Sequence, residues 1–143
     1  MARQYRYTWL RRIGNGLMEA TLRWGLGPRK TWLLTVRGRK TGREYTTPVN
    51  LVSREGTRYL VSPYGERSWV QNARAAGEVV LRRGRRMEHI HIEELGPDEA
   101  APVLADYWRQ NAITRPFFEA GPDYGEGFMK EVRSHPVFRL SVE

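Results

Sequence analysis

The chain has 143 residues, which is the size of one compact domain and leaves no room for a second. Hydrophobic residues make up 40% of it and charged residues 28%, proportions typical of a folded protein rather than a disordered tail or a membrane protein. Because the sequence contains no cysteine, disulfides, thiolate metal sites and cysteine nucleophiles are excluded. No apolar stretch reaches the roughly 18 residues of a membrane span, so we expect a cytoplasmic protein.

The excess positive charge lies at the N-terminal end of the chain. The net charge is +8 at pH 7, yet residues 1–43 hold eleven basic residues and one acidic residue, whereas the remainder holds 13 basic and 15 acidic residues. This asymmetry indicates an anionic partner, for which nucleic acid, a membrane surface and a phosphorylated cofactor are the candidates.

Residues 1–28 are predicted to form a basic amphipathic helix. Apolar residues recur three and four positions apart, with arginines around them, at Leu10, Ile13, Leu17, Ala20 and Trp24. Packing of this stripe on the domain is one explanation of the pattern, and contact with an anionic lipid surface is the other.

Six short segments rich in β-branched and aromatic residues are predicted to form strands. They are Thr31–Val36, Tyr45–Val52, Arg58–Ser62, Val79–Leu81, Met87–Glu94 and His135–Leu140. Pro48 argues for an edge or a bulge in the second of them, because proline donates no backbone hydrogen bond to a sheet.

Three helices are predicted in addition to the N-terminal one. Ser68 is the expected N-cap of a helix over Trp69–Ala76, and Gly77 is its expected end. A second helix is expected to begin at Pro97, and a third to cover Tyr124–Arg133. Short strands without a βαβ alternation predict an α+β protein, a small antiparallel β-barrel with flanking helices in one domain over residues 1–143.

The predicted turn Arg37–Arg43 is the first candidate binding site. It contains two glycines and four cationic side chains, and backbone N–H groups together with charged donors can cradle an anion. A solvated surface turn is the alternative. The second candidate is Ser62–Gly65, which offers a hydroxyl group, an aromatic ring and a glycine before a helix N-terminus, although an ordinary strand-to-helix connection has the same residue types.

Two other kinds of chemistry are not expected. His89 and His91 alternate with Ile90 and Ile92, a pattern that a strand with one buried face explains without a metal, so no metal site is predicted. The GxSxG spacing of a serine nucleophile elbow is absent from the sequence.

Several stretches of the chain together resemble the deazaflavin-dependent nitroreductase family. They are Leu33–Arg43 with its Gly-Arg-Lys-Thr-Gly turn, Thr47–Pro48, Val61–Gly65, Trp69–Ala75 and the closing His135–Phe138. The resemblance implies a split β-barrel, related to barrels that bind flavin mononucleotide (FMN). It also implies that the barrel holds coenzyme F420, a deazaflavin with a phosphodiester and an oligoglutamate tail.

The resemblance further implies which residues hold this cofactor. Arg39 and Lys40 fall on positions that grip the phosphate and the tail, and Ser62 falls near the reactive edge of the ring. The implied cofactor-binding set is Arg39, Lys40, Thr41, Gly42, Arg43, Thr47, Pro48, Ser62, Pro63, Tyr64, Gly65, Arg67, Trp69 and Asn72. Ser62 and Tyr64 are the candidate catalytic residues.

The chain departs from some relatives at Tyr45, where they carry a further arginine, and Arg43 or Arg67 is the expected substitute. Its N-terminal segment also resembles one that some relatives use for membrane association. We therefore expect peripheral membrane contact through residues 1–28, and either a monomer or a homodimer.

The expected activity is hydride transfer from reduced F420 to a planar electron-poor acceptor, such as a quinone, an enone or a nitroaromatic. Aromatic candidates for the acceptor pocket, which simple packing would equally explain, are Tyr64, Tyr107, Phe117, Phe118 and Tyr124. An FMN-dependent oxidoreductase is the alternative enzyme. A nucleic-acid-binding barrel is the alternative class, but the basic loops lack interleaved aromatic residues, so no nucleic-acid partner is expected.

Overall fold

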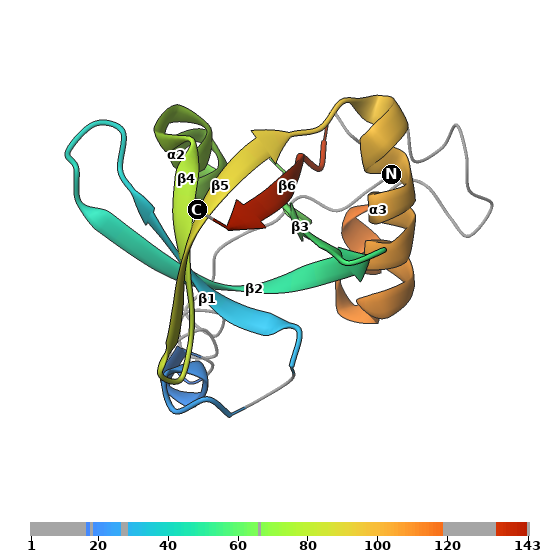
Figure 1. The fold of residues 1–143 in the computed structure, drawn as a ribbon. Coiled ribbons are helices and arrows are strands. Elements are labelled where there is room, and N and C mark those ends of the chain that lie inside the picture. Colours follow the sequence, from blue (N-terminus) through green and yellow to red (C-terminus); the bar gives the residue numbers. More distant parts are fainter. Residues whose placement is uncertain (1–16, 18, 27–28, 66, 119–133, 143) are drawn as a thin grey trace.

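The chain folds into a closed antiparallel barrel of six strands (Figure 1). The computed structural model describes residues 17, 19–26, 29–65, 67–118 and 134–142. Around the barrel the order is β1-β2-β3-β6-β5-β4. The strands are β1 (Thr31–Arg37), β2 (Glu44–Arg54), β3 (Thr57–Val61), β4 (Glu78–Arg83), β5 (Arg86–Glu94) and β6 (Val137–Val142). This confirms the predicted α+β barrel.

Alternating side chains of all six strands form one apolar cluster that fills the barrel. Its strand members are Trp32, Leu34, Val36, Leu51, Leu60, Val79, Leu81, Ile90, Phe138 and Leu140. In β5 this leaves Ile90 buried and His89 and His91 exposed, as the alternation predicts.

The long strand β2 changes its neighbour along its length. Residues 44–50 pair with β1, whereas the described pairing with β3 covers only residues 51–54. Pro48 lies opposite Leu33 in the part that pairs with β1. Within the described pairing, Pro48 therefore lies where β2 has β1 as its neighbour and needs no donor toward β3, which agrees with the expectation of an edge-like position.

Helix α2 (Ser68–Ala76) begins one residue earlier than predicted. Arg67, and not Ser68, is the N-cap; its backbone is extended and it makes no side-chain capping bond. The Arg67 carbonyl accepts the N–H groups of Val70 and Gln71, so the first helical turn already closes on Arg67. At the other end Gly77 is left-handed and its N–H donates to the Ala73 carbonyl at 2.8 Å, which confirms the predicted end.

Helix α3 (Pro97–Gln110) covers one side of the barrel, and the 3-10 helix η1 (Ala112–Phe117) follows it (Figure 1). The predicted start at Pro97 is confirmed. Buried residues of α3 form a second apolar cluster with Val52, Val61 and Val137 of the strands. Strand β6 begins two residues later than the prediction, and the helix predicted over Tyr124–Arg133 lies outside the described residues.

Residues 19–23 of the N-terminal segment are helical. The Gly84 N–H donates to the Leu22 carbonyl at 2.8 Å, so this segment lies against the tip of the β4–β5 hairpin (Figure 1). The rest of the predicted helix over residues 1–28 lies mainly outside the described part of the chain. Within that part, no helix combines the length and the apolar character needed to cross a membrane.

Candidate functional site

The cationic turn between β1 and β2 is closed by its own backbone. The Gly38 N–H donates to the Arg43 carbonyl at 2.7 Å, and the Gly42 N–H donates to the Gly38 carbonyl at 2.9 Å. A Cβ on Gly38 would lie 3.1 Å from the Arg43 carbonyl oxygen and 2.9 Å from Cε2 of Tyr45, and Gly42 has a φ of 75°, so both positions favour glycine. The folded turn thereby presents a set of exposed cations: Arg37, Arg39, Lys40 and Arg43.

One residue of α2 holds this turn. Asn72 is buried, and its Oδ1 accepts the Arg39 backbone N–H at 3.1 Å and Arg39 Nη1 at 2.7 Å. Two of the stretches that carry the family resemblance, the Gly-Arg-Lys-Thr-Gly turn and Trp69–Ala75, are therefore in direct contact.

The segment Ser62–Gly65 forms a tight turn after β3. Ser62 is fully buried; its N–H donates to the Pro136 carbonyl at 3.0 Å and its Oγ donates to the Gly65 carbonyl at 2.5 Å. Nδ1 of His135 lies 3.3 Å from the Ser62 carbonyl oxygen. The Ser62 hydroxyl is therefore used to close the turn that leads into α2.

Aromatic side chains gather beside the Ser62–Gly65 turn. The half-buried ring of Tyr64 meets Phe117 edge to face, with centroids 5.0 Å apart, and Phe118 stacks on His135 at 3.9 Å. Burial raises the pKa of the Tyr107 phenol, the nearby Tyr64 adds to this rise, and a hydrogen bond with Thr114 opposes it. Four of the five predicted acceptor-pocket aromatics thus lie in one region, and Tyr124 lies outside the described residues.

The other predicted site residues lie on β2, which follows the cationic turn, and on α2, which follows the Ser62–Gly65 turn. Thr47 and Pro48 are half-buried on β2, opposite Leu34 and Leu33 of β1. Trp69 is half-buried on α2 and packs against the barrel core, with its ring 6.5 Å from that of Phe138. Among the residues that the structure describes, no group of three or more histidine and carboxylate side chains could hold a metal ion.

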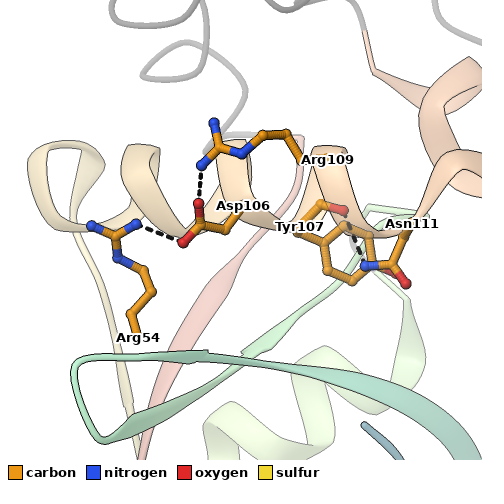
Figure 2. A network of polar contacts seen from close by, with 5 residues as sticks. All are labelled: Arg54, Asp106, Tyr107, Arg109 and Asn111. Atoms are coloured by element: carbon orange, nitrogen blue, oxygen red, sulfur yellow. Dashed lines mark hydrogen bonds and ion pairs between the residues drawn. The ribbon is translucent and has the colours of Figure 1, made fainter. Parts of the chain in front are cut away.

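Sequence reasoning missed a buried polar network at the end of α3. Asn111 Oδ1 accepts Asn50 Nδ2 at 2.8 Å and Lys30 Nζ at 3.1 Å, while Asn111 Nδ2 donates to the Tyr107 carbonyl at 3.0 Å. Figure 2 shows the last of these bonds. No sequence pattern marks Asn111, because its partners Lys30, just before β1, and Asn50 of β2 are distant along the chain.

Ion pairs fasten the same helix to the barrel. Asp106 receives Arg54 Nη1 of β2 at 2.5 Å and also pairs with Arg109 (Figure 2). The helix that precedes η1 is thus tied to β2 both by charge at Asp106 and by amide contacts at Asn111.

The comparisons with known proteins agree with this fold. A structure of an F420-H2 dependent reductase, FDR-A, is 19% identical over 79% of this chain and 95% of that chain, with a TM-score of 0.54. A domain-swapped dimer is 24% identical over 93% of this chain and 97% of that chain (TM-score 0.52). The heme storage protein HutZ from Vibrio cholerae is 14% identical over 80% and 82% (TM-score 0.57). No curated protein matches the chain.

At these identities the structural likeness establishes the fold, and the family comes from the sequence model. Residues 7–138 match the model of the F420H(2)-dependent quinone reductases, which is nearly the whole chain. The exposed cations of the glycine turn and the half-buried aromatic rings at the Ser62–Gly65 turn are the residue types that fit a cofactor with an anionic tail and a flat ring. The resemblance seen in the sequence is thus confirmed: the chain belongs to the F420H(2)-dependent quinone reductase family and is a deazaflavin-dependent oxidoreductase whose cofactor is coenzyme F420.

Proposed function

We propose that this F420H2-dependent reductase acts on a planar electron-poor acceptor, such as a quinone, an enone or a nitroaromatic. The observation that carries the proposal is the pair of rings at the Ser62–Gly65 turn, where half-buried Tyr64 meets Phe117 edge to face at 5.0 Å. Aromatic faces and edges of this kind favour a flat ligand by stacking. Reduced F420, when bound, supplies the hydride, and the protein supplies binding and orientation.

The anionic end of the cofactor is proposed to lie on the cationic turn. Arg39, Lys40 and Arg43 are exposed there, and Thr41 and Gly42 complete the turn that presents them. Charge-assisted hydrogen bonds are worth roughly 1.5 to 3 kcal/mol each, so Arg39→Ala should weaken F420 binding by about tenfold or more. Arg85→Ala removes an equal charge from another exposed loop and is the matched control.

Salt provides the second arm of this test. The loss caused by Arg39→Ala should shrink at high ionic strength, since exposed charges are then screened. An unchanged dissociation constant for both Arg39→Ala and Lys40→Ala would remove the turn from the site.

The two candidate catalytic residues receive different proposed roles. Tyr64 is half-buried, and we assign its ring to contact with the acceptor or with the edge of the deazaflavin. Ser62 is proposed to act through the turn that its hydroxyl closes on Gly65. Thr47, Pro48, Pro63, Arg67 and Trp69 are proposed to contact the rest of the cofactor.

The decisive experiment follows the hydride. F420 reduced with deuterium at its reactive carbon is mixed with excess enzyme and menadione in a single turnover. We expect a primary isotope effect and deuterium in the product. Tyr64→Leu should lower the single-turnover rate more than it weakens F420 binding, whereas Tyr59→Leu, at an aromatic of β3, serves as control.

FMN is the alternative cofactor, and a side-by-side comparison with F420 tests it. Oxidised F420 and FMN are titrated side by side into the apo-protein, and both reduced forms are then offered with the acceptor. Rapid turnover with reduced FMN and none with reduced F420 would contradict the proposal.

We also propose that a cytoplasmic pool of the protein contacts anionic membranes through residues 17 and 19–26 and the β4–β5 tip. Leu17, Trp24 and Leu26 are 68%, 82% and 62% exposed, and Met87 of the hairpin is 57% exposed. Arg85, two residues before Met87 in this hairpin, is also exposed. An apolar surface with cations around it is typical of proteins that bind anionic lipid.

Vesicle sedimentation tests this contact. The protein should bind vesicles that contain phosphatidylglycerol and not vesicles of phosphatidylcholine alone, and Trp24→Ser should weaken this binding. Tyr45→Ser, at an exposed aromatic of β2, is the control. Equal binding by wild type and Trp24→Ser would contradict the proposal.

A homodimer is the assembly that we propose, and the support for it is that a structure of this fold is a domain-swapped dimer. Light scattering during size-exclusion chromatography measures the mass directly. A mass of one protomer at micromolar concentration would contradict the homodimer.

A further inference from the structure

We propose that Asn72 is a positioning residue, which holds the Arg39 guanidinium in the orientation that binds the anionic end of the cofactor. The inference rests on the proposed role of the cationic turn. It adds the residue through which α2 controls that turn.

A single atom, Asn72 Oδ1, accepts two hydrogen bonds from the same residue. The backbone N–H of Arg39 lies 3.1 Å from it and Arg39 Nη1 lies 2.7 Å from it. Asn72 is 5% exposed, whereas Arg39 is exposed. The acceptor is therefore anchored in the interior while the guanidinium that it holds lies at the surface.

The anchor is rigid because of its neighbours on α2. Val70 and Ala73 are fully buried and belong to the apolar cluster that fills the barrel, so this face of the helix is fixed against the strands. Gln71 lies between these residues on the exposed face of the helix. Asn72 therefore holds Arg39 at a fixed position relative to the barrel core.

Such a contact favours anion binding by reducing its entropic cost. A surface arginine samples many rotamers and loses that freedom when it grips a ligand. A guanidinium that is already held by Asn72 loses less, which is the general advantage of a preorganised site. The guanidinium has five N–H donors, so donors remain for an anion after one is given to Asn72.

The chemistry of the acceptor matters as well. The Asn72 amide is neutral and leaves the positive charge of Arg39 intact, whereas a carboxylate in its place would pair with Arg39 and offset that charge. An amide oxygen therefore orients the cation without cancelling its attraction for a phosphate.

A double-mutant cycle on Asn72 and Arg39 tests this inference, with oxidised F420 and FMN as the probes. In the wild-type background Asn72→Leu should weaken binding of F420, or of FMN if that is the probe the wild-type protein binds, by about tenfold. This is the effect of a lost hydrogen bond to a charged group. In the Arg39→Met background the same substitution should change binding by less than about twofold. Gln71→Leu is the matched control and should leave binding unchanged in both backgrounds.

Two readouts separate positioning from a merely structural role. Asn72→Leu should flatten the salt dependence of probe binding, because the guanidinium then contributes less, and kcat at saturating reduced F420 should change less than its KM. A loss of thermal stability without either change would overturn the inference.

Equal weakening in both backgrounds would also overturn it, since Asn72 would then contact the cofactor directly. If Asn72→Leu fails to fold, Asn72→Ser enters the same cycle under the same criterion. A wild-type protein that binds FMN and not F420 would refute the assigned cofactor, while the cycle measured with FMN would still decide the role of Asn72.

Discussion

Replacement of Asn111 by alanine should destabilise the whole fold, because this side chain joins three segments of the chain. It accepts hydrogen bonds from Lys30 and Asn50 and donates one to the Tyr107 carbonyl. After the substitution the Tyr107 carbonyl still accepts the backbone N–H of residue 111, and Lys30 Nζ still donates to the Gln110 carbonyl. Asn50 Nδ2 is therefore the donor that loses its acceptor.

The magnitude follows from these bonds. A neutral hydrogen bond contributes about 1 kcal/mol, and a buried donor left without its acceptor costs about 1 to 3 kcal/mol; for Asn50, which is half-buried, the lower end of this range applies. The contact with Lys30 is part-buried and adds little after screening. We therefore expect Asn111→Ala to lower the free energy of unfolding by about 2 to 4 kcal/mol.

Urea denaturation of the apo-protein, followed by tryptophan fluorescence and by circular dichroism, measures this change. Gln110→Ala alters the exposed neighbour, whose backbone carbonyl still serves Lys30, and should cost less than about 0.5 kcal/mol. A loss below about 1 kcal/mol for Asn111→Ala, or one equal to that of the control, would refute the reasoning.

Three further predictions concern the hairpin, the buried phenol and the charge of the chain. In urea denaturation, Gly84→Ala should lower the free energy of unfolding by more than Gly56→Ala does. Both glycines have positive φ, but of the two only Gly84 would bring a Cβ against another backbone atom, Cα of Gly25 at 3.1 Å. Burial raises the pKa of Tyr107, so above pH about 10 the folded protein keeps a phenol proton that the unfolded chain loses. The free energy of unfolding should therefore fall as the pH rises through this range. Urea denaturation at pH 9 to 11 measures this fall, and Tyr107→Phe should remove the contribution of Tyr107 to it. DNA binding, measured by fluorescence anisotropy, should be weak and should vanish near physiological salt; nanomolar binding there would favour the nucleic-acid alternative.

The parts of the fold that depend on short-range pattern could be predicted from the sequence. Alternation in Met87–Glu94 gives the buried and exposed faces of β5, and Gly77 marks the end of α2 because a left-handed residue closes a helix. The N-cap could not be assigned in the same way. Ser68 has the right residue type, but the bonds from Arg67 to Gly65 and from Val70 to Arg67 decide where the helix begins.

The contacts that build the site are a different case, because they join residues far apart in the sequence. Asn72 meets Arg39 across 33 positions, and Asn111 meets Asn50 across 61. From residue type alone, Asn72 is a polar residue within a helix and Asn111 a polar residue at a helix end, and neither has an assigned partner. Only the closure of the barrel, which brings α2 to the β1–β2 turn and the end of α3 to β2, turns them into acceptors for specific donors.

The placement of α2 explains how one short stretch of chain can serve two different chemistries. The Ser62–Gly65 turn precedes α2 and lies beside the aromatic rings, and Asn72 within α2 holds the cationic turn. The buried residues Ser62 and Asn72 fix the two sites by their bonds to Gly65 and Arg39, while Val70 between them is anchored in the barrel core. A ligand with a charged tail and a flat ring needs its two recognition surfaces at a constant separation. A single rigid helix with buried anchors keeps that separation constant, which a flexible loop between the same residues would not do.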